Sequence, residues 1–192
     1  MRRRWWLLIG LVVIVFAVIV VVFVRDAQTS ATPVALPLTQ SFNDSASITF
    51  KYPDDWSYAI PAQGLIIVGP NQTINGGEPG PTLTIQRAEP LSIVGTLDAA
   101  LDRYLQNGPL HAPDRWQVTT AAHPIQFGGQ DARAVELEGS DSASAPPDHT
   151  QIITTTSKNQ FVYLLITTVP VSKQAAYDPT LAAMLDAVKI LE

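Results

Sequence analysis

The feature that most constrains this chain is an apolar run near its N-terminus, from Trp5 to Val24. None of these 20 residues is charged, and 16 of them are Val, Ile, Leu or Phe. Because a helix rises about 1.5 Å per residue, the run spans roughly 30 Å, which matches the apolar core of a bilayer. Burial of these side chains in lipid favours insertion by about 5 to 10 kcal/mol. We therefore predict a transmembrane helix at residues 5–24, with Trp5, Trp6 and Val24 anchoring it in the membrane.

The arginines that flank this run predict its orientation. Arg2, Arg3 and Arg4 precede it, whereas only Arg25 follows it directly. Positive charge is retained on the cytoplasmic side, so residues 1–4 form a basic cytoplasmic stub and the chain from Arg25 onward lies on the outer side of the cell membrane. The alternative is a cleaved signal peptide, whose apolar region is usually shorter and is followed by a small-residue cleavage site. We favour the uncleaved, single-pass anchor.

The exported part divides into a linker and one domain. Residues 25–46 are rich in Ser, Thr, Gln and Pro without a sustained apolar period, which predicts a flexible linker. Residues 47–192 are long enough for one folded domain, which we predict to begin at residue 47. From Asp26 onward, 8 Lys and Arg face 17 Asp and Glu, a net charge of −9 that argues against nucleic acid as a partner. The absence of cysteine excludes disulfides and thiol chemistry.

Alternating apolar residues predict short strands in the first half of the domain. These strands lie at residues 48–52, 57–60, 65–68 and 82–86, with a Gly- and Pro-rich loop at 70–81. A helix is expected from Thr96 to Asn107, since Thr96 can cap it and Asp98 lies in its first turn. Gly108 and the proline after it end this helix.

The second half is rich in strands and closes with a helix. Strands are predicted at residues 116–122 (continued by 125–127), 132–138, 151–156 and 161–169, with a turn at Gly128–Gly129. Residues 161–166 are apolar without a break, so we expect this strand at the centre of the sheet, covered on both faces. Asp178 and Pro179 predict the start of the last helix. The order of elements predicts an α+β domain with helices against an antiparallel sheet.

The stretch from Ile48 to Trp56, ITFKYPDDW, resembles the strand and Tyr-Pro-x-x-Trp motif that open domains of the PsbP-like superfamily. That superfamily groups proteins of the PsbP, Mog, LpqN and DcrB types. The order of elements is similar too, and the resemblance covers about residues 47–191. It implies an α/β/α sandwich with a central antiparallel sheet, and a non-enzymatic accessory or binding role. It supplies no catalytic residues, and this chain lacks the lipid-bearing cysteine of the lipoprotein members.

Candidate chemical groups in the sequence do not form a recognisable motif. His111, His123 and His149 are far apart, whereas a zinc site needs clustered ligands. Glu136 and Glu138 share one strand face, which is the ordinary arrangement of a half-exposed strand. We therefore predict no catalytic residues, no metal and no cofactor.

Three aromatic residues, Tyr52, Trp56 and Trp116, form the possible binding rim. The alternative, which we favour, is that they belong to the core. In that interpretation Trp56 closes one end of the sandwich, with its indole N–H hydrogen-bonded at the rim.

Together these patterns predict a membrane-anchored, extracytoplasmic accessory or interaction module without catalytic activity. Its expected partners are the lipid bilayer, through the N-terminal helix, and another membrane or envelope protein. The alternatives are a small-ligand or lipid-binding domain with an apolar cleft, and a hydrolase. A cavity of several hundred Å³ lined by the aromatic residues would favour ligand binding. A convergent trio of ionisable side chains in a cleft would favour the hydrolase.

Overall fold

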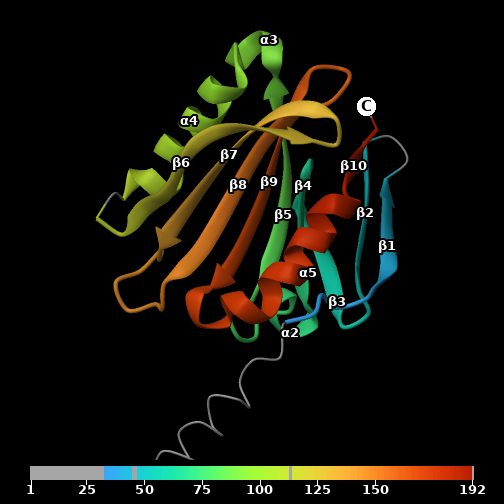
Figure 1. The fold of residues 1–192 in the computed structure, drawn as a ribbon, viewed down its shortest axis with the longest axis vertical. Helices are drawn as coiled ribbons and strands as arrows, with labels where there is room; N and C mark the ends of the chain where they lie inside the picture. Colours follow the sequence, from blue (N-terminus) through green and yellow to red (C-terminus); the bar gives the residue numbers. More distant parts are fainter. Residues whose placement is uncertain (1–32, 45–46, 113, 192) are drawn as a thin grey trace, which may run out of the picture. The chain divides into compact units, whose positions relative to one another are not determined.

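Two antiparallel sheets and two longer helices make up the part of the chain that the computed structural model describes (Figure 1). The described residues are 33–44, 47–112 and 114–191, and from Val34 onward they belong to one unit. The predicted anchor at residues 5–24, including Trp5, Trp6 and Val24, lies outside them, as do Arg2, Arg3 and Arg4. Within the described ranges, no helix is long and apolar enough to cross a membrane.

The larger sheet has seven strands in the order β3-β4-β5-β9-β8-β7-β6, and every neighbouring pair is antiparallel. The strands are β3 (Trp56–Ala62), β4 (Leu65–Pro70), β5 (Thr82–Pro90), β6 (Trp116–Phe127), β7 (Gln130–Gly139), β8 (Asp148–Thr156) and β9 (Phe161–Pro170). The continuously apolar β9 is the middle strand, as its sequence predicts. The α+β class with an antiparallel sheet is thus confirmed.

The smaller sheet corrects the predicted linker. Its strands are β1 (Leu38–Asp44), β2 (Ile48–Pro53) and β10 (Lys189–Ile190), in the order β1-β2-β10. The interpretation of residues 25–46 as a flexible linker is therefore wrong for residues 38–44, which form β1. The strand β2 belongs to this smaller sheet and not to the large one. β1 was missed because polar residues separate its two large apolar side chains, Leu38 and Phe42. The strand forms because the Phe42 ring stacks on Phe50 of β2, with 4.8 Å between the ring centroids.

The helix α4 begins where its sequence predicts, whereas the helix α5 begins earlier than its sequence predicts. α4 (Leu97–Asn107) begins as predicted, because the hydroxyl of Thr96 accepts a hydrogen bond from the Ala99 backbone N–H at 3.1 Å. α5 (Gln174–Ala187) begins before the predicted start and contains Pro179. A preceding 3-10 turn, η2 (Val171–Lys173), leads the chain into this helix. The proline therefore does not occupy the first helical position.

Short helical segments complete the connections of the domain. They are α2 (Asn71–Ile74), α3 (Leu91–Val94) and η1 (Pro109–His111). The predicted loop at 70–81 thus contains one helical turn. The turn at Gly128–Gly129 is confirmed, because both glycines have positive φ (57° and 79°) and Phe127 pairs with Gln130 across it.

The two faces of the large sheet are covered by different elements. On β9, Leu164 and Ile166 belong to a core shared with α4, whereas Tyr163 and Leu165 belong to a core shared with α5 and β2. Figure 1 shows α5 crossing in front of the strands, beside β2. On the other face α4 packs on β7 and β8. A helix therefore lies on each face, and the small sheet adds to the α5 side.

Candidate functional site

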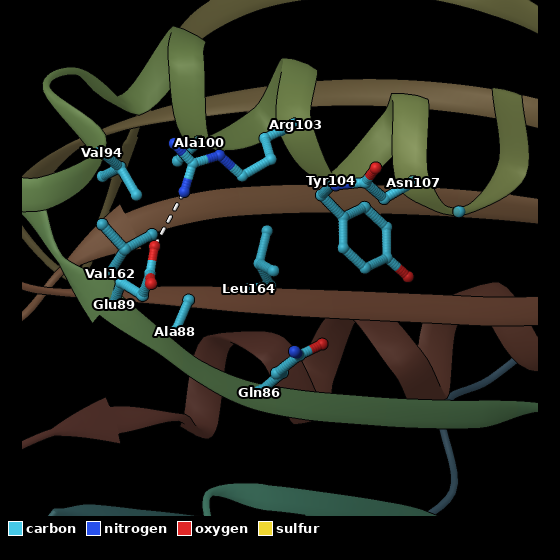
Figure 2. Close-up of a pocket in the computed structure, with 11 residues that line it drawn as sticks. Gln86, Ala88, Glu89, Val94, Ala100, Arg103, Tyr104, Asn107, Val162 and Leu164 are labelled. Atoms are coloured by element: carbon cyan, nitrogen blue, oxygen red, sulfur yellow. Dashed lines mark hydrogen bonds and ion pairs between the residues drawn. The ribbon is translucent and has the colours of Figure 1, made fainter. Parts of the chain in front are cut away.

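A pocket of about 380 Å³ opens beside α4, on the α4 face of the large sheet (Figure 2). Its floor is formed by side chains of β5 and β9, namely Gln86, Ala88, Val162 and Leu164. One wall is formed by α4, with Ala100, Arg103, Tyr104 and Asn107, and α3 closes one end with Val94. We call this the α4 pocket.

The pocket exists because α4 lies over β7 and β8, toward one side of the sheet. The alternation of β5 directs Leu83 and Ile85 into the opposite core, so that Gln86 and Ala88 point toward the α4 side. Small side chains then leave the space unfilled, since Ala88 of β5 and Ala100 of α4 both line it. The floor is therefore apolar along Val162 and Leu164 and polar at its margin.

An ion pair bridges the two walls of the α4 pocket. Arg103 of α4 donates from Nη1 to Glu89 Oε2 of β5 at 2.8 Å (Figure 2). The two side chains are 53% and 56% exposed, so solvent screens the pair and its contribution to stability is small. The pair is therefore easily opened or exchanged for another charged partner.

The Tyr104 ring points from α4 toward the floor of the pocket (Figure 2). Burial, with a smaller contribution from the charge of Asp141, raises the pKa of the Tyr104 hydroxyl above its ordinary value. The phenol therefore stays neutral at physiological pH and keeps its proton for hydrogen bonding.

The three aromatic residues of the possible binding rim are buried and do not form a common surface. Tyr52, Trp56 and Trp116 are only 9%, 3% and 9% exposed. The first two belong to the core on the α5 side and Trp116 to the core under α4. None of the three lines the α4 pocket. The expected hydrogen bond of the Trp56 indole at the rim is wrong, since its buried Nε1 has no partner within the described part of the chain.

Exposed apolar side chains gather instead on β3, an edge strand of the large sheet. Tyr58 and Ile60 are 44% and 55% exposed, and we call this pair the β3 patch. Tyr58 packs edge-on against Phe42 of β1, with 5.0 Å between ring centroids. The residues Trp56 to Ala62 carry no charge, so Pro61 and the irregular register between Ala59 and Ala62, rather than charged side chains, protect this edge strand from pairing. The sequence predicted a strand here but gave no sign that its apolar residues stay exposed.

Ionisable side chains also line a second hollow of about 280 Å³, between α5 and strands β7 to β9. Glu136, His149 and Asp178 line it. Glu136 Oε2 accepts a hydrogen bond from Thr120 at 2.8 Å. His149 Nδ1 lies 4.0 Å from the nearest oxygen of Glu138, which is beyond hydrogen-bond range. The relay of nucleophile, base and orienting carboxylate that a hydrolase needs is therefore not assembled around this histidine.

The other two histidines do not join it. His111 lies in η1, and His123 lies on the exposed edge strand β6, where its Nδ1 is 3.0 Å from the Ala121 carbonyl. Across residues 33–44, 47–112 and 114–191, no group of three or more His, Cys, Asp and Glu side chains is placed to hold a metal ion. The absence of catalytic activity and of a cofactor stays a prediction.

Comparison with solved structures places the fold. The chain is similar to cyanobacterial PsbP (CyanoP) from Synechocystis sp. PCC 6803, with a TM-score of 0.55 and 14% identity over 84% of this chain and 98% of that one. It is similar to the Saccharomyces cerevisiae Ran-binding protein Mog1p, with a TM-score of 0.56 and 9% identity over 81% and 97% of the two chains. It is also similar to LpqN of Mycobacterium tuberculosis, which is involved in cell envelope biogenesis. The TM-score is 0.51, and the identity is 16% over 80% of this chain and 91% of that one.

These likenesses define the class of protein at the level of the fold. Neither the family models nor the curated proteins compared with the sequence gave a match. The described part of the chain is an α+β domain with the fold that CyanoP, Mog1p and LpqN share. The resemblance read from residues 48–56 and from the order of elements is confirmed as a likeness of fold.

Proposed function

We propose that this protein is a membrane-anchored, extracytoplasmic interaction module without catalytic activity, which assists a membrane or envelope protein complex. The fold supports an accessory or interaction role, because structurally similar proteins include the Ran-binding Mog1p and LpqN, which is involved in cell envelope biogenesis. The apolar run at residues 5–24 supports the anchor.

The observation that carries the proposal is the β3 patch. Tyr58 and Ile60 stand on an uncharged edge strand and remain about half exposed. Exposed apolar side chains that cluster on a sheet edge are typical of surfaces that bind another protein. A partner that covers them would bury both side chains and cap the large sheet at β3.

Site-specific cross-linking in intact membranes tests this surface. A photoreactive amino acid at position 60 should give a discrete adduct with another envelope or membrane protein. Val118 on β6, the opposite edge of the sheet, is the matched control, because it is apolar and 40% exposed. Ile60→Ser should abolish co-purification of the same partner, and Val118→Ser should leave it unchanged. Equal adducts from both positions, or unchanged recovery with Ile60→Ser, would refute the β3 patch as the interface.

The anchor and its orientation have a separate test. Arg2, Arg3 and Arg4 against the single Arg25 predict an N-terminus in the cytoplasm and the domain outside. A C-terminal reporter that is active only outside the cytoplasm should therefore work, whereas one active only in the cytoplasm should not. The reverse result would contradict the orientation.

Although Tyr52, Trp56 and Trp116 do not line it, the α4 pocket supports a second candidate function, the binding of a small amphipathic molecule. Its volume of about 380 Å³ falls within the range of small-molecule sites in proteins. Its apolar floor and its few polar groups at the margin are also the usual composition of such sites. The two functions are compatible, since the pocket and the β3 patch share no residues.

A further inference from the structure

We propose that the α4 pocket binds a single-chain amphiphile with a carboxylate head group, such as a medium-chain fatty acid, and that Arg103 receives the carboxylate. This inference rests on the second candidate function above and names its ligand class. Four features of the pocket carry it: its length, its apolar floor, its charges and the position of those charges.

The shape of the pocket suits a chain. From Ala100 to Asn107 the wall runs along eight residues of α4, and the seven steps between them correspond to about 10 Å along the helix axis. Beneath this wall, Val162 and Leu164 form a continuous apolar strip on β9. An extended alkyl chain that lies along the strip would remove its methylenes from water. Each buried methylene then raises affinity by about fourfold.

The charges favour an acid over an amine. Arg103 is the one cationic side chain, and Glu89 the one anionic side chain, among the residues described as lining the pocket. A guanidinium has five N–H donors in a planar fork, and the bond to Glu89 uses only the Nη1 atom. A ligand carboxylate can therefore join or replace Glu89 on the fork. An ammonium group would instead compete with Arg103 for the same carboxylate.

The position of the charges sets the direction of the ligand. The Arg103–Glu89 pair lies near Val94 and Val162, and Tyr104 and Asn107 lie toward the opposite end of the pocket (Figure 2). The negative charge of Asp141 acts on Tyr104, so that end disfavours a carboxylate. The head group therefore belongs at Arg103, and the chain runs over Leu164 beneath the Tyr104 ring.

In this arrangement the Arg103–Glu89 ion pair determines which head group the pocket prefers. Both of its side chains are more than half exposed, so rearranging them disturbs the fold little. Loss of Glu89 would leave Arg103 without its anionic neighbour and make the site more attractive to a carboxylate. Loss of Arg103 would leave Glu89 and make it repulsive.

The test is photolabelling of the full chain in phosphatidylcholine nanodiscs by decanoate that carries a diazirine at its chain end. Labelled peptides are identified by mass spectrometry, and unlabelled decanoate, decanol and decylammonium serve as competitors. Label should fall on α4, β5 and β9, and decanoate should compete about tenfold better than decanol or decylammonium. Octanoate should compete more weakly than decanoate.

Substitutions of exposed charged residues test whether Arg103 and Glu89 cause the preference for a carboxylate. Arg103→Gln should make decanoate and decanol equal competitors, and Glu89→Gln should raise the affinity for decanoate severalfold. Arg133→Gln is the matched control, because Arg133 pairs with Asp98 at 2.8 Å near the start of α4 and does not line the pocket. It should leave both competitors unchanged.

The outcomes separate the ligand class from the pocket itself. If label falls in the pocket but decanol or decylammonium competes as well as decanoate, the carboxylate assignment is wrong and the ligand-binding function survives. The same holds if Arg103→Gln keeps the preference for the acid. If label is not saturable, or falls outside the residues that line the α4 pocket, both the ligand class and the ligand-binding function are wrong.

Discussion

Replacement of Trp56 by alanine tests how the two sheets are held together. Trp56 begins β3 directly after the turn from β2, and only 3% of it is exposed. Its ring lies 6.4 Å from the Tyr177 ring of α5, centroid to centroid, at an interplanar angle of 51°. The side chain therefore connects the small sheet, the edge of the large sheet and α5 in one core.

The magnitude follows from the burial of the ring. A Trp side chain buries roughly 150–250 Å², which at about 25 cal/mol per Å² gives an upper limit of about 4 to 6 kcal/mol. Comparable substitutions of large core aromatics cost about 3 to 5 kcal/mol. The buried Nε1 has no hydrogen-bond partner within the described residues, and such a donor costs the native state about 1 to 3 kcal/mol. Because alanine removes this donor as well, we expect a net loss of about 3 kcal/mol.

Trp56→Phe separates the two contributions. Phenylalanine keeps most of the apolar ring and removes the N–H, so its cost should stay within about 1.5 kcal/mol. Val118→Ala, at an exposed position on β6, should change stability by no more than about 0.5 kcal/mol.

The assay is urea unfolding of the full chain in a mild detergent, followed by the far-ultraviolet circular dichroism of the sheets. An unfolding midpoint for Trp56→Ala within error of wild type would refute the core role of this residue. A cost for Trp56→Phe as large as that for Trp56→Ala would refute the argument from the unpaired N–H.

Two further predictions concern β1. A fragment of residues 34–192 should unfold cooperatively. A fragment of residues 47–192 should aggregate or lose stability, because it lacks the strand β1 that pairs with β2. Equal behaviour of the two fragments would show that β1 is dispensable. Asp54 Oδ1 accepts hydrogen bonds from Thr39 and Gln40 of β1 at 2.5 and 2.6 Å, and these bonds lower the pKa of Asp54. A lowered folded-state pKa means that the stabilisation is present above the unfolded pKa of about 3.9 and is lost as the pH falls through the folded value. Hydrogen exchange of the β1 amides should therefore quicken as the pH, after correction for intrinsic exchange, falls below about 4, and Asp54→Asn should remove this pH dependence.

Several elements could be predicted because their signals are local. Thr96 and Asp98 mark the start of α4 through groups within one helical turn. Gly128 and Gly129 supply the positive φ angles that a two-residue hairpin requires. β9 could be assigned to the centre of the sheet because a strand that is apolar on both faces must be covered on both.

Strand pairing between distant segments could not be predicted in the same way. β1 carries too few apolar residues to stand out, and it becomes a strand because β2 offers it backbone partners and the ring of Phe50. The last helix begins earlier than Pro179 predicts, because the turn η2 leads the chain into α5 five residues before this proline. For β1 an interaction with a distant segment outweighs the local preference, whereas for α5 the turn directly before the helix does so.

The apolar run at residues 5–24, the α+β class and the likeness to the PsbP-like fold follow from composition, periodicity and the order of elements, which can be read along the chain. The place where a ligand or partner could bind became visible in the folded domain. The α4 pocket joins Ala88, Ala100 and Val162, which are ordinary core-type residues more than 70 positions apart at the extremes. They enclose a space only because α4 lies over β7 and β8 and leaves β5 open. The physical reason is that a cavity depends on the placement of packed elements, and no single segment encodes that placement.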